Sequence, residues 1–147
     1  MPSLQDRLSA ELITARKAQD KPLTLLLGTI LSDIKNREIE LRRTPSDDEV
    51  IDVLRKGVKK RRESIAMYAQ AGRTELAAQE TAEVAALERF LPAVATDDEI
   101  RTAVRATIAA GAIGVGPVMA KVMPQFKGRA EGGTINRVVR EELGKAE

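Results

Sequence analysis

The densest cluster of residues that could bind a charged ligand is the run from Arg55 to Arg62, which holds six cations and no acid. On a helix, at about 100° per residue, most of these cations share one broad polar face. The members of this face are Arg55, Lys56, Lys59, Lys60 and Arg62. Two interpretations stay open: a solvated helix surface, or a stripe that binds phosphate groups.

A second group of cations lies near the carboxyl end, and Glu131 is the only acid between its first and last members. The group consists of Lys121, Lys127, Arg129, Arg137 and Arg140. Gly128 lies among them, and Gly132-Gly133 leads into a predicted helix whose first backbone amides could bind an anion. This combination predicts a phosphate-binding surface, and it is the first candidate for contacting RNA.

One cation of the first run, Arg61, falls inside the apolar stripe of its predicted helix, between Val58 and Ile65. Glu80 and Glu83 fall inside the apolar stripe of the next predicted helix in the same way. An antiparallel hairpin that turns at Gly72 would bring the two stripes together. Because an unpaired charge on an apolar seam is costly to desolvate, we expect Arg61 to pair with Glu83 or Glu80. Such a pair either fixes the register of the two helices or marks a buried functional site.

The missing residue types exclude most catalytic chemistry. The chain has no Cys, His or Trp, so it can form no disulfide, thiolate nucleophile, imidazole base or ordinary zinc site. Ser, Lys, Asp and Glu are present, but their spacing reveals no pair of nucleophile and base. We therefore expect no catalytic residues, no metal and no cofactor, and a protein that is not an enzyme on its own.

The elements that must position these residues are helices. Apolar residues recur at helical spacing, and aromatic residues make up only 2% of the chain, which favours packed helices over a β-sandwich. Ser46-Asp47-Asp48-Glu49 and Thr96-Asp97-Asp98-Glu99 are typical of capping boxes at helix starts rather than of metal sites. The predicted helices cover about 4–20, 22–43, 47–71, 74–90, 97–110, 117–123 and 134–143. Val118, Met119, Val122 and Met123 are interpreted as core rather than as a cofactor site.

This pattern predicts an all-α protein with two domains. Residues 1–92 should form a four-helix bundle or pair of hairpins, and residues 93–147 a small three-helix subdomain. With 43% hydrophobic and 31% charged residues the chain is globular, and no apolar run reaches the about 20 residues that span a bilayer. The first residues do not resemble a signal peptide, so we expect a soluble cytoplasmic protein. The net charge of +2 means that nucleic-acid binding would depend on local clusters.

Several short motifs, in order, resemble the YqeY family. They are Ile34-Lys35-Asn36, Lys59-Lys60-Arg61-Arg62-Glu63-Ser64, Ala71-Gly72-Arg73, Leu91-Pro92, Val118-Met119 and Lys127-Gly128-Arg129-Ala130. That family is similar to the carboxy-terminal tail of GatB, a component of the tRNA-dependent amidotransferase, which is a carbon–nitrogen ligase that uses glutamine as amido donor. The resemblance implies a helical bundle with a small tail domain that reaches the body of a tRNA. The matching tail positions include Gly116, Met119 and Lys121.

Three functions follow as expectations. The first is a tRNA-binding or tRNA-sensing module without a catalytic site of its own. The second is a helical adaptor that docks on a protein of the translation machinery. The third is an accessory role in amide transfer, although the amidase component of the amidotransferase and the kinase-like core of GatB lie outside the similar region. The sequence names neither the tRNA nor the partner, and it leaves the oligomeric state open.

Overall fold

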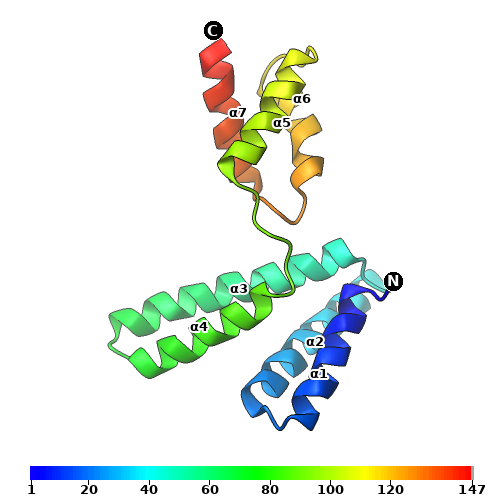
Figure 1. Cartoon of the computed structure of the whole chain (residues 1–147), viewed down its shortest axis with the longest axis vertical. Helices are drawn as coiled ribbons and strands as arrows, with labels where there is room; N and C mark the ends of the chain where they lie inside the picture. The colour runs from blue at the N-terminus through cyan, green and yellow to red at the C-terminus, as the bar shows by residue number, and fades with distance from the viewer. Residues whose placement is uncertain (147) are drawn as a thin grey trace. The chain divides into compact units, whose positions relative to one another are not determined.

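A computed structural model describes residues 1–146, and their chain folds into two compact units (Figure 1). The first unit is Met1–Leu91 and the second begins at Pro92, one residue before the boundary expected from the sequence. The described residues contain α-helices and one 3₁₀ helix and no strand. The predicted all-helical fold is therefore confirmed.

The first unit consists of two helical hairpins. Helices α1 (Leu4–Lys17) and α2 (Lys21–Leu41) pair with each other, and so do α3 (Asp47–Gln70) and α4 (Thr74–Glu88) (Figure 1). Aliphatic side chains from all four helices form one core, as the scarcity of aromatic residues requires. The side chains that are wholly buried in it are Leu8, Leu27, Ile30, Ile34, Leu54 and Leu87.

Local signals in the sequence account for where these helices begin and end. Both halves of the capping box at Ser46 and Glu49 are present at the start of α3. Asp47, beside this cap, also accepts a hydrogen bond from the backbone N–H of Leu4 at 3.0 Å, which joins the start of α1 to the start of α3. Gly72 ends the α3 hairpin arm with φ of 72°, a conformation that glycine adopts without strain.

The second unit packs three α-helices and a 3₁₀ turn around its own core. The elements are α5 (Asp97–Ala109), α6 (Val115–Val122), η1 (Met123–Phe126) and α7 (Gly132–Ala146). Each α-helix contacts the other two, so the unit is closed by helix packing alone. Its most buried side chains are Ile100, Val104, Val118, Val122, Val138 and Val139.

The structure differs from the sequence-based expectations in three details. Met123, expected in the core, is 43% exposed because η1 begins there and the chain leaves the α6 axis. Leu76 shares a face of α4 with Val84 and Leu87 by helical spacing, yet it is 37% exposed beside the hairpin turn. At the start of α5, Thr96 accepts from the Glu99 N–H as predicted, but the Glu99 carboxylate turns to Arg129 instead of returning to the cap.

Candidate nucleic-acid interface

The segment Lys127-Gly128-Arg129-Ala130 forms a tight turn between η1 and α7. The carbonyl of Phe126 accepts hydrogen bonds from the backbone N–H of Arg129 at 2.8 Å and of Ala130 at 3.0 Å. Gly128 takes φ of 76°, which a residue with a side chain rarely adopts. The glycine of this motif is thus explained by the turn that it makes.

The Arg129 side chain holds the segment that leads into α5. Its Nε donates to the carbonyl of Ala93 at 3.1 Å, and its Nη2 lies 2.6 Å from Oε2 of Glu99. The Arg129 carbonyl accepts from the N–H of Ala95 at 2.8 Å. Arg129 therefore connects the η1–α7 turn to the entry of the second unit, which is a structural role.

Arg137 and Arg140, on α7, have polar partners within the unit. Arg137 lies 2.8 Å from Asp97 and 3.1 Å from Glu141, so it pairs with two carboxylates on two helices. Arg140 donates a hydrogen bond to the side chain of Asn136 at 2.8 Å, and this partner is neutral. Arg140 is exposed and remains suited to an outside anion.

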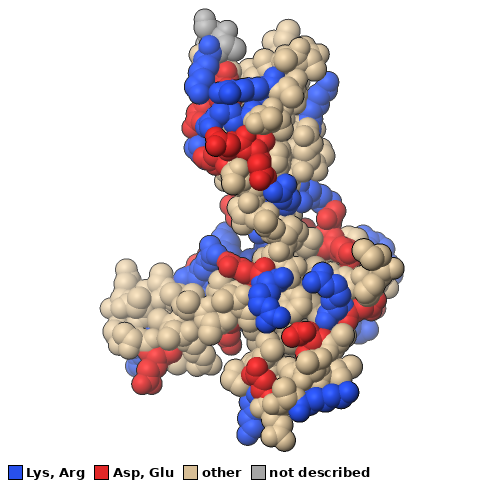
Figure 2. Space-filling view, viewed as in Figure 1, with Lys and Arg blue, Asp and Glu red and all other residues tan. Residues whose placement is uncertain are grey.

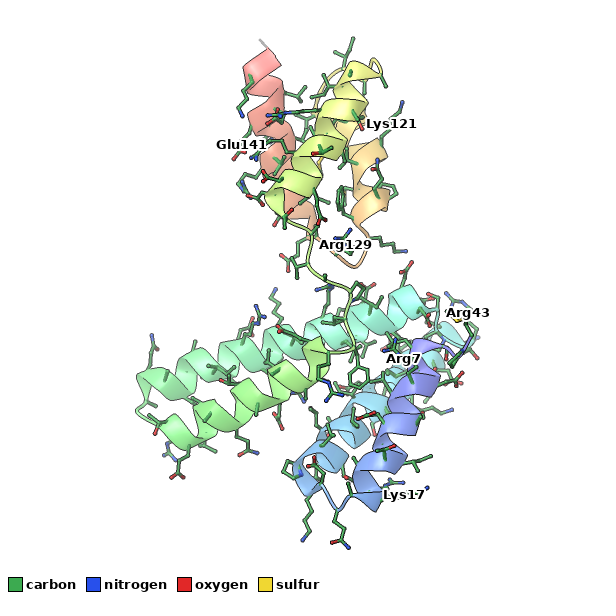
Figure 3. The ribbon with its side chains drawn as sticks, in the orientation of Figure 1. Arg7, Lys17, Arg43, Lys121, Arg129 and Glu141 are labelled. Carbon is green, nitrogen blue, oxygen red and sulfur yellow. The ribbon has the colours of Figure 1, made fainter. Side chains whose placement is uncertain are left out.

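Lys121 and Lys127 lie on the α6–η1 side of the unit, and both are exposed. Residues 115–130, which form α6, η1 and the turn after them, contain no acid. Figure 3 shows Lys121 on α6 and Glu141 on α7 at opposite sides of the unit. In Figure 2, red and blue side chains mix over α7 and the start of α5, whereas the α6 side is mostly tan with a blue patch.

A buried acid, Glu142, pairs with three cations of this unit, and the sequence analysis did not identify it. Its side chain is 5% exposed, and its Oε2 accepts from Arg105 Nε at 2.9 Å. Arg101 Nε lies 2.9 Å from Oε1 as an ion pair without hydrogen-bond alignment, and Lys145 lies 3.3 Å away. The hydrogen bond from Arg105, aided by Lys145, lowers the pKa of Glu142 to about 2, although burial acts in the opposite direction. Glu142 follows Ile135 by seven residues, so its place on the apolar stripe was a usable signal.

The basic run of the first unit lies along α3. Lys56, Lys59 and Lys60 are exposed, and Arg55 is half-buried. Arg62 forms an ion pair with Glu88 of α4, and both side chains are largely exposed. The run therefore presents lysines to solvent while at least one of its arginines joins the two arms of the hairpin.

Arg61 lies between α3 and α4 and pairs with Glu83, as the apolar stripes of the two helices predicted. Its Nε is 3.4 Å from Oε2 of Glu83, and its Nη1 donates to the carbonyl of Gly57 at 3.1 Å. The two side chains are 15% and 25% exposed, so the pair is partly shielded from water. Burial, and then the hydrogen bond and charge of Glu83, raise the pKa of Glu80, and Arg61 offsets only part of this effect.

A groove of about 560 Å³ opens beside this pair, between α2, α3 and α4. Gly57 forms part of its wall, and a Cβ there would lie 3.2 Å from Arg61 Nη1 and 3.3 Å from Ile30 Cδ1. A glycine inside a helix costs about 1 kcal/mol, and here the close approach of Arg61 explains it. The wall carries four carboxylates and four cations: Asp33, Glu40, Glu80, Glu83, Arg37, Lys56, Lys60 and Arg61.

Two further features are missing from the described residues. Between Met1 and Ala146, no three acidic side chains gather closely enough to hold a metal ion. Within the same range, no helix combines the length and the apolar character needed to cross a membrane.

Fold and surfaces together define a class: a two-unit helical protein with two hairpins followed by a three-helix unit that carries the basic α6–η1 surface. The chain belongs to the YqeY family, described as Yqey-like protein, whose model matches residues 5–143.

Two curated relatives are similar to this chain. An uncharacterized protein of Schizosaccharomyces pombe is 30% identical over 92 residues, which cover 63% of this chain and 75% of the relative. The protein named altered inheritance of mitochondria protein 41, mitochondrial, of Pyrenophora tritici-repentis is 27% identical over 129 residues, covering 84% and 71%. Neither name specifies a chemical activity.

Proposed function

We propose that this chain is an RNA-binding module, with tRNA as its first candidate ligand, and that the α6–η1 surface of the second unit contacts the phosphate backbone. The observation that supports this proposal is the separation of charges within that unit. The carboxylates of residues 92–146 other than Glu131 lie at the start of α5 and on α7, where they pair with Arg101, Arg129 and Arg137. Lys121 and Lys127 lie in a stretch of 31 residues, 100–130, that has no acid.

The ion pairs within the unit change which of the candidate residues we expect to contact RNA. Arg129 and Arg137 bind carboxylates of their own unit, so they position the surface rather than supply its charge. Lys121 is exposed and can neutralise a phosphate, and Arg140 can add a further contact because it donates its hydrogen bond to a neutral amide. Aromatic residues are scarce, so phosphate contacts would give the affinity and the shape of the RNA the selectivity.

Filter binding of the full chain to total tRNA across a salt series tests the proposal. Affinity should fall with salt, with a log–log slope of about 0.7–0.9 for each phosphate contact. The double variant Lys121→Glu/Lys127→Glu should weaken binding and lower this slope by about one to two. Circular dichroism checks that each variant is folded.

Two matched variants sharpen the result. Lys59→Glu/Lys60→Glu makes the same charge change on α3, and Lys17→Glu/Lys21→Glu makes it at the α1–α2 turn. We expect both to bind tRNA more tightly than the variant on the α6–η1 surface. A larger loss from the α3 variant would move the interface to the first unit. Salt-independent or absent binding by the parent would refute the RNA proposal and favour a protein-docking role.

The proposal places the protein in the cytoplasm, where tRNA is abundant. The name of the Pyrenophora relative places that protein in mitochondria, which makes the organelle the competing location. Fractionation of cells that express a tagged chain, followed by blotting against markers of each compartment, distinguishes the two.

A further inference from the structure

The groove between α2, α3 and α4 is lined by side chains of both charges, and only half of them pair with each other. Two pairs form along its wall: Arg61 with Glu83 at 3.4 Å, and Arg37 with Glu40 at 3.0 Å. Among the residues that the structure describes, the other four charged side chains of the wall have no oppositely charged partner within 4.0 Å. These are Asp33, Glu80, Lys56 and Lys60.

The positions of these four side chains suit a ligand with two charges. Lys56 and Lys60 are one helical turn apart on α3, so their ammonium groups can approach the same anion. Asp33 comes from α2 and Glu80 from α4, the helices that form the other walls. Asn36 and Ser64 add hydrogen-bonding groups, and a volume of about 560 Å³ lies in the range of small-molecule sites.

We propose that this groove binds a small zwitterion, the chemical class of the free amino acids, with its carboxylate at Lys56 and Lys60 and its ammonium at Asp33 and Glu80. The two charged groups of such a ligand would each give a partner to two of these four side chains. The acidic side of the groove supports this, because burial and the neighbouring Glu83 raise the pKa of Glu80 and a bound ammonium would relieve that destabilisation. The proposal concerns the first unit and is independent of RNA binding by the second.

A series of ω-amino acids, which differ in the distance between ammonium and carboxylate, tests the proposal without assuming that distance. Glycine, γ-aminobutyrate and ε-aminocaproate are titrated into the isotope-labelled full chain, with butyrate and butylammonium as probes that carry one charge each. We expect at least one zwitterion to shift the amide signals of α2 and α3 with a Kd of about 1 mM or tighter. Each single-charge probe should bind at least about tenfold more weakly.

Three variants assign the binding to this groove. Lys60→Gln and Glu80→Gln should each weaken the best zwitterion about tenfold, or about 1.4 kcal/mol. Lys59→Gln is the matched control, because Lys59 is exposed on the same helix but does not line the groove, and it should bind like the parent. Equal binding of butyrate, no shift by any zwitterion up to about 10 mM, or equal losses in all three variants would overturn the proposal. These measurements contain no RNA, so their failure leaves the tRNA test unaffected.

Discussion

Arg105 of α5 donates a hydrogen bond to the buried carboxylate of Glu142 on α7, with 2.9 Å between Nε and Oε2. The two helices pack against each other, and Arg101, one turn earlier on α5, lies 2.9 Å from the other oxygen. A carboxylate that is shielded from water and shared by cations from two helices fixes their register, because neither helix can slide without leaving the charge unpaired.

This relationship makes the stability of the second unit depend on pH. The pKa of Glu142 in the folded chain is about 2, below its ordinary value of 4.5, so the ionised form is favoured by folding. Its contribution is complete above about pH 4.5 and is lost as the pH falls toward 2. Glu142→Gln should therefore lower the unfolding temperature at pH 7 and reduce that loss in acid.

Thermal unfolding followed by circular dichroism from pH 7 to pH 2 measures this effect. Glu131→Gln is the control, since Glu131 is an exposed acid of the same unit. Glu49 in the first unit also has a pKa lowered to about 2, through its hydrogen bond from Arg43, so the parent should lose stability in acid from both units. Identical pH profiles for Glu142→Gln and the parent would contradict the prediction.

The Arg61–Glu83 pair should contribute more to stability than the neighbouring surface pair. Arg61→Ala removes the bonds to Glu83 and to the Gly57 carbonyl, and should cost about 1–3 kcal/mol in the free energy of unfolding. Arg62→Ala breaks the exposed pair with Glu88 and should cost less than about 1 kcal/mol. Urea unfolding of the two variants gives the comparison. Equal losses in the free energy of unfolding would mean that the partial burial of the Arg61–Glu83 pair does not increase its contribution to stability.

Glu80 should destabilise the first unit at neutral pH. Burial and the adjacent Glu83 raise its pKa in the folded chain, so ionisation is less favourable there than in the unfolded chain. Stability should accordingly be highest below the ordinary value of 4.5 and fall as the pH rises from there through the raised pKa. We expect Glu80→Gln to raise the unfolding temperature at pH 7, with the gain vanishing in acid. Glu83→Gln should instead lower it, because that change leaves Arg61 without its partner; a Glu80→Gln variant less stable than the parent would refute the prediction.

Arg129 should matter for folding more than for ligand charge. Arg129→Ala removes the hydrogen bond to Ala93 and the partly exposed pair with Glu99, and should cost about 1–2 kcal/mol in the second unit. Lys127→Ala, at the other end of the turn, is the comparison. A loss of tRNA affinity in Arg129→Ala that is as large as in Lys121→Glu/Lys127→Glu, with unchanged stability, would instead show that Arg129 contacts the RNA directly.

The sequence by itself determined the helical fold, the two units and several local details. Aliphatic residues at helical spacing, with few aromatic residues, bury their side chains by packing helices together. The cap at Ser46 and the turn at Gly72 depend on residues close in the chain. It also indicated a partner for Arg61, because a charge on an apolar stripe must be compensated by the helix packed against it.

Only the tertiary structure decided which charges remain available to a ligand. Arg129 and Lys121 belong to the same basic group in the sequence, but folding brings Glu99, 30 residues away, onto Arg129. The same is true of Arg137, which meets Asp97 from 40 residues away. The groove beside Gly57 combines side chains from three helices, so no single stretch of sequence contains it. Periodicity specifies which face a residue occupies, whereas the side chain opposite that face is fixed only when the helices pack.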